Sequence, residues 1–145
     1  MDKKDEKTEE TTHRLMDLLN RALRLEYSLI VHYPRLANTI KDEETRKLVL
    51  QLGSASIRHA DVVANTISQL GGEPDWSIEL YPEDMDTVKI FQTQLEKEKL
   101  ALQLHRESAD LVPSSSLRGE LSALAMEEEQ HIKIVNHILS RLNPL

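Results

Sequence analysis

A glutamate and a histidine near the C-terminal end of the chain occupy positions where a helix would normally carry apolar side chains. In residues 117–142, leucine, valine and isoleucine recur every three or four positions, which is the spacing of one helical face. Glu128 and His131 fall on that same face, one turn apart. A buried ionised carboxylate is normally paired, neutralised or bound to a metal. Glu-x-x-His at this spacing therefore predicts a metal ion in the interior of a helical bundle.

The same chemistry recurs earlier in the sequence. A shift of 72 residues without gaps aligns Glu26 with Glu98 and His59 with His131, together with several apolar positions that follow each histidine. The chain therefore reads as two helical hairpins, each with a glutamate on its first helix and a histidine on its second.

One position breaks this repeat. Ser56 is aligned with Glu128, so the first hairpin lacks the carboxylate of the second. Four carboxylates normally offset the charge of two divalent ions, and only three are present here. We therefore expect about one tightly held ion per chain, with a second position that is weak or filled by water.

Oxygen and imidazole donors make up the whole predicted site. One glutamate from each of two helices, combined with Glu-x-x-His, is the pattern of di-iron and di-manganese carboxylate proteins. Such donors suit iron, manganese or zinc rather than copper(I). The chain has no cysteine, which excludes disulfides, thiolate catalysis and iron–sulfur clusters. The predicted metal ligands are Glu26, His59, Glu98, Glu128 and His131.

Some of these positions have ordinary alternatives. A single inward histidine such as His59 is more often a core residue, and Glu98 lies in the charged run 96–99, which would suit a solvated face. The repeat favours a ligand role for both. Glu127 and Glu129 do not fall on the apolar stripe, so we assign them to a solvated acidic face.

Two further side chains share the faces of the inward glutamates. Tyr33 lies seven residues after Glu26, so its hydroxyl would point into the same interior, although an ordinary core aromatic is the alternative. His105 takes the equivalent position seven residues after Glu98.

The helical segments predicted to position these groups form one domain. They run from Thr11 or Thr12 to Ile40, from about Asp42 to Gly71, from about Asp86 to Pro113, and from about Ser114 to Leu142. Residues 72–86 are long enough to run the length of the bundle, which makes the second and third helices parallel and the other neighbours antiparallel. Trp76 and Tyr81 would pin this crossover or lie in a subunit contact. The sequence thus predicts an all-α four-helix bundle over residues 11–145, preceded by a flexible tail, residues 1–10.

Composition narrows the class of protein. Apolar residues make up 39% and charged residues 30% of the chain, which suits a water-exposed helical bundle. The net charge of −7 argues against nucleic acid as the main partner. No signal peptide and no apolar run long enough for a membrane span is visible, so we expect no membrane partner and a cytoplasmic location.

From about Leu15 to Leu142 the chain resembles the ferritin-like superfamily, most closely bacterioferritin and rubrerythrin-type di-iron proteins. The resemblance rests on four motifs: Leu19-Asn20 with Glu26 and Tyr33, Arg58-His59-Ala60-Asp61, Leu70-Gly71-Gly72-Glu73-Pro74, and Glu127-Glu128-Glu129-Gln130-His131-Ile132. It implies that Glu26 and Glu98 are terminal carboxylate ligands, Glu128 a bridging ligand, and His59 and His131 imidazole ligands. It also implies that Tyr33 takes part in electron transfer, as a catalytic residue.

The sequence departs from this family pattern in three places. Ser56 stands where the family has its second bridging glutamate. Ile57 stands where bacterioferritins have the methionine that ligates haem, so we expect no haem. The chain stops soon after the fourth helix and lacks the short fifth helix of cage-forming members. We therefore expect a homodimer or small homo-oligomer rather than a storage shell.

The expected function is iron-dependent redox chemistry, as a ferroxidase or a peroxide-reducing oxidoreductase, with dioxygen or peroxide as the oxidant. Other di-metal oxidases, such as a hydroxylase or a manganese catalase, belong to the same class of site. The alternative from a different class is a non-enzymatic helical bundle whose degenerate site holds one metal ion or none. Metal analysis of the purified protein discriminates between these classes.

Overall fold

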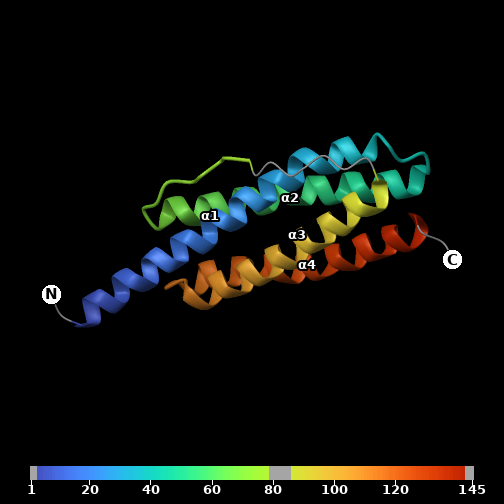
Figure 1. Cartoon of the computed structure of the whole chain (residues 1–145). Helices are drawn as coiled ribbons and strands as arrows, with labels where there is room; N and C mark the ends of the chain where they lie inside the picture. Colours follow the sequence, from blue (N-terminus) through green and yellow to red (C-terminus); the bar gives the residue numbers. More distant parts are fainter. Residues whose placement is uncertain (1–2, 79–85, 143–145) are drawn as a thin grey trace.

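The computed structural model describes residues 3–78 and 86–142, which contain the helices α1 (Lys3–Ala37), α2 (Glu43–Gln69), α3 (Thr87–Leu111) and α4 (Ser115–Leu142). The helices pack as two hairpins, α1 with α2 and α3 with α4, and the hairpins meet through α1 on α3 and α2 on α4. Figure 1 shows that α2 and α3 run in the same direction, whereas the helices within each hairpin are antiparallel. The predicted all-α four-helix bundle is confirmed, with its long crossover between the hairpins.

Short polar side chains start three of the helices, as the sequence predicts. The Asp42 carboxylate accepts a hydrogen bond from the Thr45 backbone N–H at 3.1 Å at the start of α2. Asp86 and Ser114 cap α3 and α4 in the same way. These caps satisfy backbone donors that a helix leaves without partners in its first turn.

The first helix begins earlier than the predicted start at Thr11. Residues 3–10 are helical and exposed, and they continue without a break into the buried part of α1. Lysine and glutamate are good helix formers, Asp5 and Glu6 suit the positive N-terminal end of the helix, and no glycine or proline interrupts the segment. Because nothing in this segment is buried, the apolar pattern could not reveal its helical backbone. The flexibility of residues 1–10 in solution stays a prediction.

The apolar core is divided into two clusters, one towards each end of the bundle. On α1, the first cluster contains the buried apolar residues between Leu15 and Leu25, and the second begins at Leu29. On α4, the buried residues of the first cluster end at Leu124, and those of the second begin at Val135. Between them lie buried polar side chains, which form a polar layer across the middle of the bundle.

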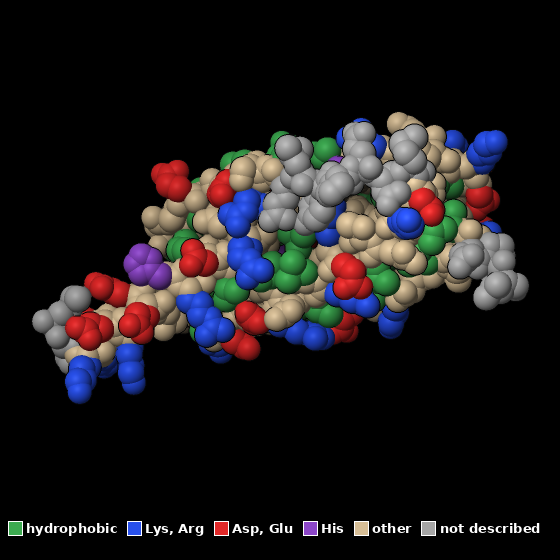
Figure 2. Space-filling model, viewed as in Figure 1, with side chains coloured by type: hydrophobic (Ala, Val, Ile, Leu, Met, Phe, Trp, Pro, Cys, Tyr) green, Lys and Arg blue, Asp and Glu red, His purple; other side chains and the backbone are tan. Residues whose placement is uncertain are grey.

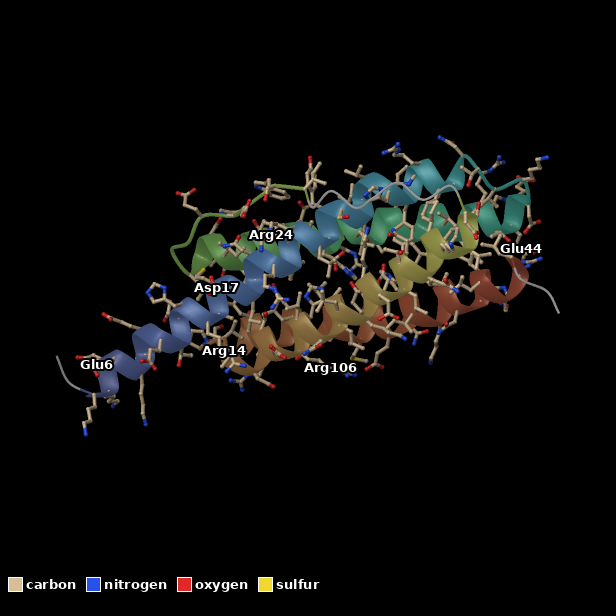
Figure 3. All side chains as sticks on the ribbon, viewed as in Figure 1. Glu6, Arg14, Asp17, Arg24, Glu44 and Arg106 are labelled. Carbon is tan, nitrogen blue, oxygen red and sulfur yellow. The ribbon has the colours of Figure 1, made fainter. Side chains whose placement is uncertain are left out.

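The described part of the crossover is tied to α1. Arg24, which is labelled in Figure 3, forms an ion pair with Asp75 at 2.9 Å. The Trp76 ring packs edge-on against Tyr27, with 5.9 Å between the ring centroids. Trp76 therefore pins the crossover, although 46% of its surface stays exposed. Tyr81 lies outside the described residues.

Charged groups of both signs are mixed over the face of the molecule shown in Figure 2, with apolar side chains between them. Ion pairs link neighbouring helices at the surface: Arg106 on α3, labelled in Figure 3, pairs with Glu129 on α4. Within residues 3–78 and 86–142, no helix contains an apolar stretch that could span a membrane.

Close packing of α1 on α2 depends on Gly53. A Cβ atom at this position would lie 3.3 Å from the Tyr33 Cβ and 3.6 Å from the Pro34 Cδ. We expect Gly53→Val to lower the free energy of unfolding by about 1–3 kcal/mol through overpacking.

The control is Gly119→Ala in α4, where a Cβ meets nothing within 4 Å. That change should raise stability by about 0.5–1 kcal/mol, because glycine is a poor helix former. Urea unfolding followed by circular dichroism measures both, and equal effects would contradict the packing argument.

Candidate metal centre

All four helices contribute to the polar layer between the two apolar clusters. The structure brings the five residues singled out in the sequence into this layer. Four of them have no exposed surface, and the fifth, His131, is 7% exposed. These residues are Glu26 on α1, His59 on α2, Glu98 on α3, and Glu128 and His131 on α4.

The layer contains two groups of ligand-type atoms that share one residue. Glu26, His59, His105 and Glu128 form one group, which we call the four-residue half. The Glu26 Oε1 atom lies 3.3 Å from His59 Nδ1 and 3.0 Å from His105 Nε2. The Glu128 Oε1 atom lies 2.8 Å from the same His59 nitrogen and 3.7 Å from the same His105 nitrogen. Two carboxylates and two imidazoles therefore face a common centre.

The second group, which we call the three-residue half, consists of Glu98, Glu128 and His131. His131 Nδ1 lies 3.2 Å from Glu98 Oε2 and 3.5 Å from Glu128 Oε2. Glu128 thus turns one oxygen towards each half. That is the arrangement that a carboxylate bridging two ions requires.

Tyr33 lies against the three-residue half. Its hydroxyl donates a hydrogen bond of 2.9 Å to Glu98 Oε1, which leaves Glu98 Oε2 beside His131. Burial, together with the charge of Glu98, raises the pKa of the Tyr33 phenol well above its usual range. The phenol therefore stays protonated and acts as a hydrogen-bond donor.

His105 is the residue that the sequence reasoning missed. It was placed on the inward stripe of the third helix but not among the ligands, because its partner in the repeat is Tyr33 rather than another histidine. In the structure it is fully buried and contacts Glu26. The signal that would have found it is the spacing of seven residues from Glu98, which places both side chains on the inner face of α3.

The assignment of Glu127 to a solvated face is wrong. Its Oε2 atom lies 2.6 Å from His59 Nε2, and its other oxygen accepts a hydrogen bond from Arg58 at 2.7 Å. Glu127 therefore backs His59 on the side away from the centre, and it holds His59 Nδ1 towards Glu26 and Glu128. A carboxylate behind a histidine is the usual way to orient a metal-binding imidazole. The assignment of Glu129 to the exposed face agrees with the structure.

Ser56 is buried but does not contribute to the cluster. Its hydroxyl donates to the Leu52 backbone oxygen at 3.1 Å, one turn back in its own helix. The residue before it, Ala55, is the repeat partner of Glu127. On α2 two small side chains therefore stand where α4 has two carboxylates.

The pKa values of the cluster follow from burial and mutual contacts. Burial raises the pKa of Glu26, and burial with a hydrogen bond to Glu128 raises that of Glu98 well above its usual range. Burial opposes ionisation of Glu128 as well, but hydrogen bonds from Glu98 and the imidazoles lower its pKa well below its usual range. Burial also opposes charging of the imidazoles. Hydrogen bonds, that to Glu128 first, outweigh it and raise the pKa to about 11 for His59 and about 9 for His131.

These directions describe carboxylates that repel one another and are held together by shared protons. A divalent cation would supply the same positive charge, with release of those protons. The side chains alone leave part of the cluster unsatisfied. Among the described residues, Glu26 Oε2 and Glu128 Oε2 are buried without a hydrogen-bond partner, which is costly for a carboxylate oxygen.

The donor set fits a divalent ion. Within each half, the atoms that could bind a metal lie within 4.8 Å of one another. Carboxylate and imidazole donors without sulfur suit iron, manganese and zinc. The residues present therefore fit the metal that the sequence pattern predicts.

Solved structures with the same fold come from several bacteria. A ferritin-like, diiron-carboxylate protein from Bacillus anthracis str. Ames is 21% identical, with a TM-score of 0.79; the match covers 89% of this chain and 97% of that one. A dodecameric thioferritin, the bacterioferritin-related protein from Bacteroides fragilis, is 19% identical over 90% and 87% of the two chains, with a TM-score of 0.76.

The bacterioferritin of Rhodobacter capsulatus is 25% identical over 91% of this chain and 89% of its own, with a TM-score of 0.71. The structure of that protein is described as having a metal-free dinuclear site and haem iron. Comparison with functionally curated proteins gives no match. The sequence itself matches the family described as Ferritin-like domain over residues 16–144, nearly its whole length. The chain therefore belongs to the ferritin-like domain family.

Proposed function

We propose that this protein binds iron at the carboxylate–histidine centre and carries out redox chemistry there, as a ferroxidase or a peroxide-reducing enzyme. The observation that carries the proposal is the position of Glu128. Inside a buried layer, its Oε1 faces His59 and His105 while its Oε2 faces His131. Two imidazole-containing halves joined by one carboxylate suit a pair of ions that act together.

Bound iron would supply the electrons: two ferrous ions would give the two electrons that convert hydrogen peroxide and two protons into two water molecules, or dioxygen and two protons into hydrogen peroxide. The protein's own residues would do the rest. Glu26, Glu98 and Glu128 offset the charge of the ions, and the imidazoles fix their positions. The apolar clusters on both sides keep bulk water from reaching the layer along the axis of the bundle.

Tyr33 is the proposed catalytic side chain. Its hydrogen bond holds Glu98 Oε1, so that Glu98 Oε2 is directed to the three-residue half. The same phenol is an oxidisable group next to the centre, and it can supply an electron and a proton.

A rapid-mixing experiment tests this function. Protein loaded with ferrous iron without oxygen is mixed with dioxygen or with hydrogen peroxide, and ferric absorbance is followed. We expect oxidation faster than that of ferrous iron in the same buffer, and about 100-fold slower in Tyr33→Phe, the lower end of the range for loss of one catalytic side chain. Tyr27→Phe is the matched control, because Tyr27 packs on Trp76 away from the centre. Tight iron binding with no acceleration by either oxidant would reject the redox function.

Ser56 favours a second candidate function. With no buried carboxylate on α2, the centre carries less negative charge than two divalent ions require. The second candidate is therefore a non-enzymatic bundle that holds one ion. That ion is iron, zinc or manganese. Metal analysis together with the oxidation experiment separates the two candidates.

Haem is not part of the proposal. Ile57, at the position where the resemblance places a haem ligand, offers no ligand atom. It is 51% exposed on α2, and Leu50, two turns earlier, is 46% exposed. These apolar side chains are the reason that a homodimer or small homo-oligomer remains the proposed assembly.

A further inference from the structure

The two halves of the centre differ in composition, although the repeat relates them. The 72-residue shift aligns Glu26 with Glu98 and His59 with His131, but it aligns Tyr33 with His105. Tyr33 and His105 also make equivalent contacts, each to the inward glutamate of the other hairpin. The three-residue half therefore has a phenol where the four-residue half has an imidazole.

The four-residue half has the spacing of a complete coordination shell. A tetrahedral ion with bonds of about 2.0–2.2 Å keeps its ligand atoms about 3.3–3.6 Å apart. The four separations between its carboxylate oxygens and imidazole nitrogens range from 2.8 to 3.7 Å. Only small side-chain movements would complete a shell of two nitrogens and two oxygens.

The two halves also differ in access. Glu26, His59, His105 and Glu128 have no exposed surface. His131, in contrast, lines a surface pocket of about 270 Å³ between α2 and α4. Ala55 lines the same pocket, and its small side chain, where the repeat would place the counterpart of Glu127, leaves space beside His131.

We infer that the halves have different roles: the four-residue half retains a resident divalent ion, and the three-residue half exchanges its ion through the pocket between α2 and α4. His105 is the residue that makes the difference. It gives the resident position a fourth ligand, in place of the phenol that the other half receives from Tyr33. This inference rests on the proposed metal-binding function and assigns the order in which the two positions fill.

Hydrogen-bond partners of the imidazoles agree with this assignment. His59 is held from behind by Glu127 at 2.6 Å, so its Nδ1 is fixed towards the resident position. The residue that the repeat places behind His131 is Ala55, which has no polar atom in its side chain. His131 therefore lacks from α2 the support that His59 receives from α4.

Cobalt(II) is a suitable probe, because each imidazole bound to it gives a strongly shifted N–H signal in a proton NMR spectrum. The full chain, freed of metal with a chelator, is titrated with cobalt(II) alone. We expect two such signals with the first equivalent, from His59 and His105, and a third from His131 with the second. Transfer to a competing chelator should be slow for the first ion and fast for the second.

Two substitutions related by the repeat sharpen the test. His105→Gln should remove one of the first two signals and weaken the first equivalent by at least the about 10–100-fold that loss of an outer partner causes. Tyr33→His should add a fourth signal and tighten the second equivalent. His137→Gln is the control, because His137 is exposed on α4 and should leave all signals unchanged.

The outcomes separate this inference from the proposed function. A first equivalent that gives one imidazole signal, or that binds unchanged in His105→Gln, would overturn the inference even if iron is oxidised. Unequal halves without any iron oxidation would uphold it and reject the redox function. The absence of cobalt(II) and iron(II) binding would reject both. If a variant fails to fold, the number of shifted imidazole N–H signals from the wild-type protein at each equivalent of cobalt(II) still tests the inference.

Discussion

Glu128→Ala should abolish tight binding of the resident ion and weaken the second, exchanging position as well, because Glu128 belongs to both halves of the centre. We expect a loss of affinity larger than the about 10–100-fold that follows removal of an outer-shell partner. Isothermal titration with iron(II) under anaerobic conditions, or with manganese(II), measures the effect. Helix content should survive, since the two apolar clusters and not the metal hold the helices together.

The control is the neighbouring carboxylate. Glu129 is exposed on α4 and pairs with Arg106, so Glu129→Ala should bind metal as the parent does. His131→Ala should weaken only the three-residue half. Equal loss of metal in the Glu128 and Glu129 variants would show that the ions are not held in the polar layer.

Ser56→Glu should give the centre a second strongly held ion. The side chain at position 56 is buried one turn before His59, and its repeat partner is Glu128. A glutamate there would restore Glu-x-x-His on α2 and supply the fourth carboxylate. Without metal, the added carboxylate lies close to three others, so stability should fall by about 1–3 kcal/mol.

Metal should reverse that loss. An ion that binds only the folded state stabilises it by about 2.7 kcal/mol when its free concentration is 100 times the dissociation constant. The variant should therefore melt below the parent without metal and above it with iron(II) or manganese(II), and it should oxidise ferrous iron faster. Ser54→Glu, at an exposed position of the same helix, is the control and should change neither melt. A variant that melts lower in both conditions and binds no further ion would contradict the placement of residue 56 beside the centre.

Much of this architecture could be predicted from the sequence, because a bundle helix with a buried face has a strict apolar spacing. Glu26, Glu98 and Glu128 interrupt that spacing and were therefore visible as inward carboxylates. The repeat then identified His59 and His131 as ligands, because the 72-residue shift aligns one histidine with the other. The same comparison missed His105, whose repeat partner is a tyrosine.

Contacts between helices were harder to predict than the face on which a residue lies. Glu127 is next to the apolar stripe and not on it, which made it look solvated. It reaches His59 because α2 and α4 lie side by side and Arg58 holds its other oxygen. The relative position of two helices depends on how all four pack, and the periodicity of one helix does not contain that information. The early start of α1 was missed for a simpler reason: its first turns bury nothing.

The polar layer also divides the bundle mechanically. The two apolar clusters lie on opposite sides of it, so the ends of the molecule share little hydrophobic packing and are joined mainly by the continuous backbones of the helices. Segments coupled in this way tend to open as separate cooperative units. An ion held by side chains from all four helices is a non-covalent cross-link in this polar layer, and it couples the unfolding of one end of the bundle to that of the other. Metal loading would thus set the cooperativity of unfolding as well as the stability of the fold.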